Sequence, residues 1–333
     1  MEKRYIGKTK MLINRVGFGG IPVQRISKEE ASVVIKYAIN KGVNFIDTAR
    51  GYTCSEEYIG YAVENVERNK YYIATKSMAR TYDGMKEDIL KSLDNLKCGY
   101  IDLYQIHNLT SEKDLETVLN GAYKALIDAK EKGLIKHIGI TSHNYEFLYD
   151  VLDKNLFETI QFPYNIVERK SESLFEKAHN MGIGTICMKP LAGGAIDKGS
   201  VAIKYLLNDE NVDVIIPGMA LVSEVDENIS VTACEYTKEE KEYIERIINE
   251  LDGDFCRRCG YCAPCTVGIN IASCFLFEGY YRRYNLKGWA KNRYNSMDKF
   301  ASDCIECGAC VKRCPYGLDI PKKLKSVKEV FGK

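Results

Sequence analysis

The chain has 333 residues, 45% of them apolar and 28% charged, and its 47 basic and 46 acidic side chains leave a net charge of only +1. This balance is typical of a globular protein and excludes a disordered chain or a protein that wraps nucleic acid. No run of about 18 apolar residues occurs and residues 1–11 have no apolar segment, so we expect no membrane span and no secretory signal, and predict a cytoplasmic protein.

Segments rich in β-forming residues alternate with amphipathic stretches through the first 250 residues, which predicts eight βα units. Eight such units in about 250 residues match a (β/α)8 TIM barrel. A doubly wound sheet that binds a dinucleotide would carry G-x-G-x-x-G after its first strand, and Gly17, Gly19 and Gly20 do not have that spacing. Residues 4–15 predict a hairpin that plugs the bottom of the barrel. The strands are expected to begin near residues 16, 44, 71, 101, 135, 159, 184 and 212, and the helices to span 28–42, 55–65, 83–97, 115–132, 145–152, 172–181, 201–208 and 224–234.

Polar residues stand where three of these strands end. Asp47 ends the second predicted strand and leads to Tyr52, Lys76 ends the third, and His107 ends the fourth. The carboxyl ends of barrel strands carry the chemistry in this fold, so we expect the four side chains to meet on one face. A lysine and an aspartate among apolar strand residues would be costly without partners, which predicts that they pair.

Three segments carry a resemblance to a known family: FIDTARGY (45–52), IATKS (73–77) and DLYQIHN (102–108). In order and spacing they resemble the aldo-keto reductases, and the likeness extends over residues 4–250. The whole chain resembles the bacterial subgroup of that family that carries a ferredoxin-type C-terminal domain.

This resemblance implies a reaction and a role for each of the four residues. Hydride would pass from a nicotinamide to a carbonyl carbon, Tyr52 would give the oxygen its proton, and His107 would hold that oxygen. A free tyrosine has a pKa near 10, so it needs a nearby positive charge to serve as acid and base near neutrality. The ammonium of Lys76 would stabilise the tyrosinate, and Asp47 would keep Lys76 protonated and oriented.

The same resemblance implies a nicotinamide pocket at the ends of the later strands. Met188 replaces a tyrosine that stacks on the nicotinamide ring, and a thioether can also pack against an aromatic face. Glu224 replaces an arginine that grips a 2′-phosphate, which favours NADH over NADPH or weak binding of either, unless Glu224 is a solvated glutamate at a helix start. The expected cofactor-binding residues are Thr141, Ser142, Gln161, Met188, Lys189, Pro190, Leu191, Gly193, Pro217, Gly218, Glu224 and Asn228.

The last 83 residues are a different kind of sequence, because nine of the 13 cysteines lie there. The net charge also changes sign, from −6 in residues 1–250 to +7 in residues 251–333. We therefore predict two domains with a boundary at 250/251. Thiols stay reduced in the cytosol, so cysteines at this density indicate a metal centre rather than disulfides.

The cysteine spacing indicates two [4Fe-4S] clusters in a small, α-rich, ferredoxin-like domain. The second run is C-x2-C-x2-C-x3-C-P, the bacterial ferredoxin signature, and the first lacks one residue in its last gap. Likeness to two-cluster ferredoxins implies that the fourth cysteine of each run serves the other cluster. A zinc site is the alternative, although eight cysteines exceed what it needs. Cys274 is expected to be a buried free thiol. The two ligand sets are Cys256, Cys259, Cys262 and Cys314, and Cys304, Cys307, Cys310 and Cys265.

The two halves imply different electron counts, since a hydride carries two electrons and each cluster passes one. The clusters would transfer electrons to or from a ferredoxin or flavoprotein partner, or would have a structural role at the rim of the substrate pocket. Alternatively, the protein is a nicotinamide-independent iron–sulfur oxidoreductase, or an electron carrier without enzymatic activity. The expected substrate is a small carbonyl compound or alcohol, and neither nucleic acid nor membrane is expected as a partner.

Overall fold

The computed structural model describes every residue except 1, 252–255, 257–261 and 315. The chain divides into two compact units. The first comprises Met1–Ala192 and Lys198–Glu235, and the second comprises Gly193–Asp197 and Tyr236–Lys333. This division differs from the boundary expected at 250/251 because the second unit also takes in Gly193–Asp197 and the residues from Tyr236 onward, which include helix α10 (Lys238–Leu251).

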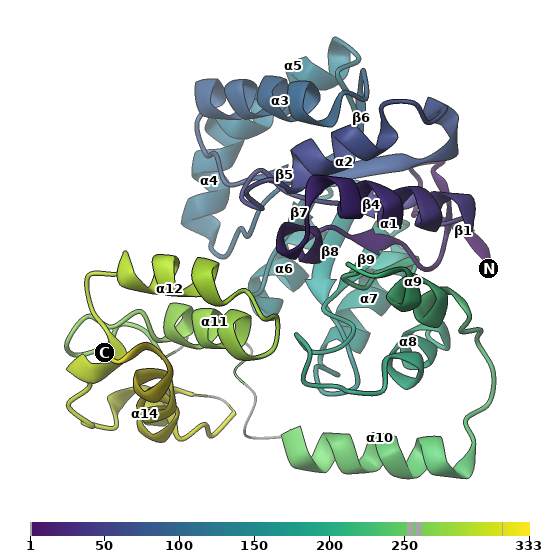
Figure 1. Cartoon of the computed structure of the whole chain (residues 1–333). Coiled ribbons are helices and arrows are strands. Elements are labelled where there is room, and N and C mark those ends of the chain that lie inside the picture. Colours follow the sequence, from purple (N-terminus) through teal and green to yellow (C-terminus); the bar gives the residue numbers. More distant parts are fainter. Residues whose placement is uncertain (1, 252–255, 257–261, 315) are drawn as a thin grey trace. The chain divides into compact units, whose positions relative to one another are not determined.

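Eight parallel strands form a barrel at the centre of the first unit (Figure 1). Each strand pairs with the next one along the chain, and bridges at Val16–Ile215 and Gly19–Gly218 join the last strand to the first. The predicted (β/α)8 architecture is confirmed, with a strand at each of the eight expected places. The strands are β3 (Phe18–Gly19), β4 (Phe45–Asp47), β5 (Tyr72–Ser77), β6 (Ile101–Ile106), β7 (Ile135–Thr141), β8 (Thr159–Pro163), β9 (Gly184–Met188) and β10 (Val214–Ile216).

A hairpin closes the amino-terminal end of the barrel, as predicted. Its strands β1 (Lys3–Tyr5) and β2 (Leu12–Asn14) pair antiparallel. Between them the backbone passes so close to the start of β9 that a Cβ on Gly7, whose φ is +46°, would lie 2.4 Å from the backbone nitrogen of Gly184. The side chain of Ile6 is fully buried in the cluster that fills the inside of the barrel. The hairpin therefore excludes water from the end opposite to the expected site.

Helices follow the strands and bury their apolar faces against the outside of the barrel. Serine, threonine and asparagine side chains cap several of them; Ser27, for example, forms a capping box with Glu30 at the start of the first helix. The helices of this unit are α1 (Lys28–Asn40), α2 (Ser55–Val63), α3 (Tyr82–Leu96), α4 (Glu112–Asn120), α5 (Ala122–Glu131), α6 (Tyr145–Leu152), α7 (Ser171–Asn180), α8 (Gly199–Leu207) and α9 (Val222–Ile229), with short 3-10 turns at Pro22–Arg25 and Arg68–Lys70.

One predicted helix, 115–132, is wrong as a single element, because Gly121 divides it into α4 and α5. The backbone nitrogen of Ala122 donates to the carbonyl oxygen of Arg80, 3.1 Å away, instead of continuing the helical ladder. A Cβ on Gly121 would lie 2.7 Å from that oxygen. The break thus comes from a contact with a residue some 40 positions earlier, which local periodicity does not report.

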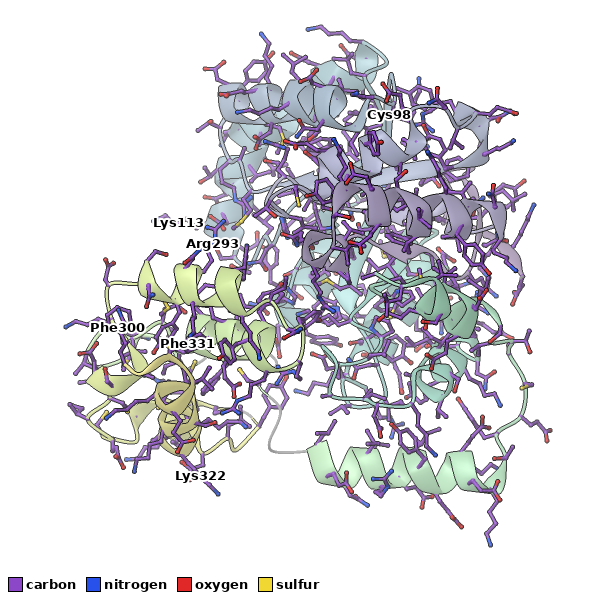
Figure 2. All side chains as sticks on the ribbon, in the orientation of Figure 1. Cys98, Lys113, Arg293, Phe300, Lys322 and Phe331 are labelled. Carbon is purple, nitrogen blue, oxygen red and sulfur yellow. The ribbon has the colours of Figure 1, made fainter. Side chains whose placement is uncertain are left out.

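The second unit is helical in its described residues and has an apolar core of its own. Tyr294 is fully buried, stacks on Phe331 with ring centroids 4.1 Å apart, and accepts a hydrogen bond from the backbone of Ala301. Figure 2 labels Phe300 and Phe331 in this unit. Cys274 is also fully buried, as predicted, and burial raises the pKa of its thiol to about 12. The remaining elements are α11 (Ile271–Arg282), α12 (Lys287–Asn295), η3 (Ala301–Asp303), α13 (Ala309–Arg313) and α14 (Ile320–Phe331).

No helix in the described ranges of the chain has the length and apolar character that a membrane crossing requires.

Candidate functional site

A buried ion pair lies at the carboxyl ends of β4 and β5. The Nζ atom of Lys76 donates to both carboxylate oxygens of Asp47, at 2.6 and 2.8 Å, and to the backbone oxygen of Thr48 at 2.8 Å. Lys76 is only 1% exposed. Burial lowers the pKa of Lys76 and raises that of Asp47, while the pairing opposes both shifts. Since all three ammonium protons have acceptors, the geometry holds Lys76 in its charged form.

Tyr52 lies on the connection between β4 and α2 and places its ring beside this pair. The Nζ atom of Lys76 is 5.2 Å from the centroid of the Tyr52 ring. The ring of His107, which directly follows β6, meets the Tyr52 ring edge to face, with centroids 6.1 Å apart and an angle of 87°. The structure thus brings together all four side chains that the strand ends singled out.

His107 is held as a neutral imidazole. Burial, followed by the positive charges of Lys76 and Arg80, lowers the pKa of His107 to about 3. Arg80 also donates to the backbone oxygens of His107 and Asn108, both at 3.1 Å. Among the described residues, the buried Nδ1 atom of His107 has no hydrogen-bond partner. A neutral imidazole carries one N–H, which can be donated to a ligand oxygen.

Gln105 joins the site and was missed in the sequence. Its Nε2 atom donates to Oε1 of Gln161 at 2.8 Å, and the Nε2 atom of Gln161 lies 3.5 Å from Asp47 Oδ1. All three side chains are nearly fully buried. Side-chain alternation along β6 could have identified Gln105, because residues 103, 105 and 107 share one face of the strand and the last of these is His107.

Three of the expected cofactor-binding residues, Thr141, Ser142 and Gln161, lie next to one another. Thr141 and Gln161 are paired in register on β7 and β8, and the backbone nitrogen of Ser142 donates to the oxygen of Gln161 at 3.3 Å. Thr141 Oγ1 accepts a hydrogen bond from the backbone of Asn108 at 2.8 Å, and Ser142 Oγ accepts one from the backbone of Asn144 at 3.0 Å. Each hydroxyl therefore accepts one hydrogen bond from the backbone, and can still form further hydrogen bonds with a ligand.

Met188 ends β9, and Lys189 follows it at the carboxyl end of the strand. Met188 is partly exposed and pairs in register with Pro163 and Ile216 on the neighbouring strands. Lys189 has a φ of +58°, and its Nζ atom lies 3.3 Å from Nδ1 of His143. Pro190 is buried and Leu191 partly exposed in the same connection.

Gly193 has a φ of +70° and lies in the second unit, where its backbone oxygen accepts a hydrogen bond from Nε of Arg283 at 3.0 Å.

Glu224 caps a helix rather than projecting freely. Its Oε2 atom accepts hydrogen bonds from the backbone nitrogens of Ala220, at 2.6 Å, and Leu221, at 3.1 Å, in front of α9. Asn228 is buried one turn later in the same helix. Pro217 and Gly218 follow β10, and a Cβ on Gly218 would lie 2.6 Å from the ring of Pro22.

Four cysteines line one hollow in the second unit. They are Cys265 from the first run and Cys304, Cys307 and Cys310 from the second, which is the set expected from likeness to two-cluster ferredoxins. Thr266 Oγ1 lies 3.3 Å from the sulfur of Cys307. Four thiolates form the donor set of a [4Fe-4S] cluster, so these residues fit that group. Within the described residues no three cysteine, histidine or carboxylate side chains converge as the ligands of a single metal ion do.

The other ligand set is described only in part, because Cys259 lies outside the described residues. Cys256, Cys262 and Cys314 all pack against the core of the second unit. Arg313 donates to the backbone oxygens of Cys262, at 3.0 Å, and Pro264, at 2.6 Å, and so fastens the first run next to the last cysteine of the second run.

Comparison with protein families decides the classification of both parts. Residues 15–201 match the model of the aldo/keto reductase family. The chain belongs to the aldo/keto reductase family. Residues 255–319 match a 4Fe-4S dicluster domain, so the chain combines a reductase barrel with a domain for iron–sulfur clusters.

Relatives of this reductase include an uncharacterized oxidoreductase, YqkF, of Bacillus subtilis, 29% identical over 59% of this chain and 67% of the relative. The L-galactose dehydrogenase of Arabidopsis thaliana is 25% identical over 69% of this chain and 88% of its own. The solved structure of the aldo-keto reductase AKR11C1 from Bacillus halodurans superposes with a TM-score of 0.65 and 23% identity, over 74% of this chain and 96% of that chain. The last match bears on the fold alone.

Proposed function

We propose that the barrel interconverts a small aldehyde or ketone and its alcohol with NAD(P)(H), and that Tyr52 donates the proton during reduction. One observation carries this proposal: the Tyr52 ring lies close to two groups, with its centroid 5.2 Å from the buried ammonium of Lys76 and 6.1 Å from the centroid of the neutral His107 ring. A phenol, a cation and an imidazole N–H at one strand-end face are the groups that carbonyl reduction requires.

Lys76 has the task of making Tyr52 acidic enough. Its positive charge favours the tyrosinate over the neutral phenol, so the proton of Tyr52 can leave as the carbonyl oxygen gains charge. Asp47 keeps the ammonium charged and fixed in place within a site that excludes water. Reprotonation of Tyr52 from solvent would complete the turnover.

His107 holds the carbonyl oxygen. Because the imidazole stays neutral far below neutral pH, its N–H can donate to the oxygen without transferring a proton. Tyr52 then remains as the acid, and the two donors together fix the orientation of the carbonyl group.

Bound nicotinamide would supply the hydride. Thr141, Ser142 and Gln161 would hold its carboxamide, since they lie side by side at the ends of β7 and β8. Met188 would cover the ring, and Lys189, Pro190 and Leu191 would border the pyrophosphate. Pro217, Gly218, Glu224 and Asn228 would line the adenosine.

NADH is the proposed form of the cofactor. The Glu224 carboxylate accepts the amide hydrogens in front of α9, where a 2′-phosphate would otherwise bind. Its charge would repel that phosphate, because like charges at one helix start are unfavourable. A titration that finds NADPH bound more tightly than NADH would overturn this preference.

The second unit would bind two [4Fe-4S] clusters, through Cys265, Cys304, Cys307 and Cys310 and through Cys256, Cys259, Cys262 and Cys314. Such clusters supply single electrons when bound.

Met188 and Glu224 depart from the residues that bind nicotinamide nucleotides in the family, and this favours a second candidate function. The protein would then be a nicotinamide-independent oxidoreductase or electron carrier supplied with electrons by a ferredoxin or flavoprotein. Anaerobic mixing with NADH and with dithionite separates the two: substrate reduced by dithionite but not by NADH favours the second.

The decisive experiment uses anaerobically purified protein with its iron and acid-labile sulfide measured. A panel of small aldehydes, ketones and sugars, chosen because one relative is named a sugar dehydrogenase, is assayed with NADH and NADPH. Tyr52→Phe is expected to abolish most of the turnover at unchanged iron content. Equal turnover by this variant would refute the role of Tyr52, and no turnover by the wild-type protein would refute carbonyl reduction.

A further inference from the structure

Arg50 lies on the connection that carries Tyr52, yet its side chain points away from the reactive groups. The guanidinium donates to Oε2 of Glu56 in α2, and its Nε atom lies 3.5 Å from Oδ1 of Asp88 in α3. The backbone nitrogen of Arg50 donates to the oxygen of Lys76 at 3.0 Å. One residue thus fastens this connection to two helices and to β5.

The same two carboxylates hold β5 on either side of Lys76. Glu56 Oε1 accepts a hydrogen bond from Thr75 Oγ1 at 2.8 Å, and Asp88 Oδ2 accepts one from the hydroxyl of Ser77. Successive side chains of a strand point to opposite faces. Thr75 and Ser77 therefore face the helices while Lys76 faces the inside of the barrel.

Glu56 carries the carboxylate of this network that is shielded from solvent. Glu56 is 1% exposed, and its carboxylate also accepts hydrogen bonds from Ser92, at 2.8 Å, and Asn95, at 3.2 Å, in α3. The Arg50 side chain is 19% exposed and is the cation nearest to both carboxylates among the ion pairs of the described residues. A guanidinium can serve two acceptors in fixed directions, whereas an ammonium acts as a point charge.

We propose that Arg50 is a positioning residue that sets the distance between the Tyr52 phenol and the Lys76 ammonium. It ties the Tyr52 connection and the outer face of β5 to the same pair of carboxylates, Glu56 and Asp88. The inference rests on the proposed function, because the distance matters only if Tyr52 transfers a proton. Displacement of the phenol by about 1 Å would lower turnover on the order of 100-fold.

Arg68 offers a matched control at the opposite end of the barrel. Its side chain is 21% exposed, and it pairs with Asp102 at 2.5 Å and donates to the backbone oxygens of Cys98, Tyr71 and Tyr100. Arg50→Lys and Arg68→Lys each keep the charge and lose the planar fork. Both variants are expected to lose a similar amount of thermal stability.

The two variants are compared in steady-state kinetics on the holoprotein. Arg50→Lys is expected to lower kcat about 10-fold to 100-fold with little change in KM, and to shift the pH profile of kcat/KM, because the acid has moved from its cation. Arg68→Lys is expected to keep kcat and the pH profile. Equal effects of the two variants on kcat would overturn the proposal, because a general loss of stability would then explain both.

A double variant guards against misfolding. Arg50→Met alone leaves Glu56 buried without its cation, whereas Arg50→Met with Glu56→Gln removes both charges together. The double variant is expected to fold and still lose kcat, and wild-type turnover by it would refute the positioning role.

Amide hydrogen exchange of residues 48–54 tests the same idea without turnover. Exchange should become faster in Arg50→Lys than in Arg68→Lys, and unchanged exchange would contradict the inference. If the wild-type protein reduces no carbonyl compound, the proposed function fails while this readout still decides whether Arg50 holds the connection.

Discussion

Asp47 accepts both of its shortest hydrogen bonds from Lys76, through carboxylate oxygens 2.6 and 2.8 Å from Nζ, inside a barrel that leaves the lysine 1% exposed. The attraction between the two charges offsets the free-energy cost of removing each of them from water. Removing one partner of such a pair leaves an uncompensated buried charge, whereas removing both does not.

We therefore expect Lys76→Met to lower the free energy of unfolding by about 3–5 kcal/mol and to abolish carbonyl reduction. Asp47→Asn combined with Lys76→Met should recover most of the stability and none of the turnover. Urea unfolding of the three proteins measures the first effect and the carbonyl assay the second. Turnover by the double variant would show that the ammonium is dispensable.

Much of this site could be predicted from the chain alone, because it follows from local patterns. Runs of β-forming residues between amphipathic stretches located the strands, and the strand ends located Asp47, Lys76 and His107. Cysteine spacing and likeness to two-cluster ferredoxins predicted that Cys265 shares a cluster with the first three cysteines of the second run. In the structure Cys265 lines one hollow with those three cysteines.

The features that were missed depend on partners distant in the sequence. The break at Gly121 comes from the carbonyl oxygen of Arg80, and the Arg50 network joins α2, α3 and β5. Glu224 was given two readings, and only the positions of the Ala220 and Leu221 amides show that its carboxylate caps α9. Residue type alone cannot show which backbone amides a carboxylate at a helix start will bind.

Neutral His107 predicts a specific pH dependence of stability. The folded protein keeps this imidazole neutral down to about pH 3, while the unfolded chain protonates it near the ordinary pKa of 6.5. As the pH falls below about 6.5, the unfolded state binds a proton that the folded state does not, so the free energy of unfolding decreases. His107→Gln keeps an N–H donor and removes the titration, so its stability should fall less between pH 7 and pH 5. Parallel stability curves for the two proteins would show that His107 is not held neutral.

Glu158 predicts a further loss of stability at lower pH. Burial would raise its pKa, but hydrogen bonds with His137, Lys130 and the backbone of Ile138 prevail and lower it to about 2. The stabilisation is therefore complete above the ordinary value of 4.5 and is lost as the pH falls from there toward 2. Glu158→Gln should flatten the stability curve in this window, and the exposed Glu131→Gln should not. Identical acid transitions in the two variants would contradict the shift.

The cysteines of the second unit allow a direct test of ligand assignment. Cys265 lines the hollow with Cys304, Cys307 and Cys310, whereas Cys274 is fully buried in the apolar core of the same unit. Cys265→Ser is expected to lower the iron and acid-labile sulfide of the anaerobic protein from about eight toward four per chain, because one of two four-iron clusters loses a ligand. Cys274→Ser buries a hydroxyl, so it should destabilise the unit by about 1–3 kcal/mol at full iron content. Iron analysis together with the visible absorbance of the clusters measures both, and loss of iron in the Cys274 variant alone would reverse the assignment.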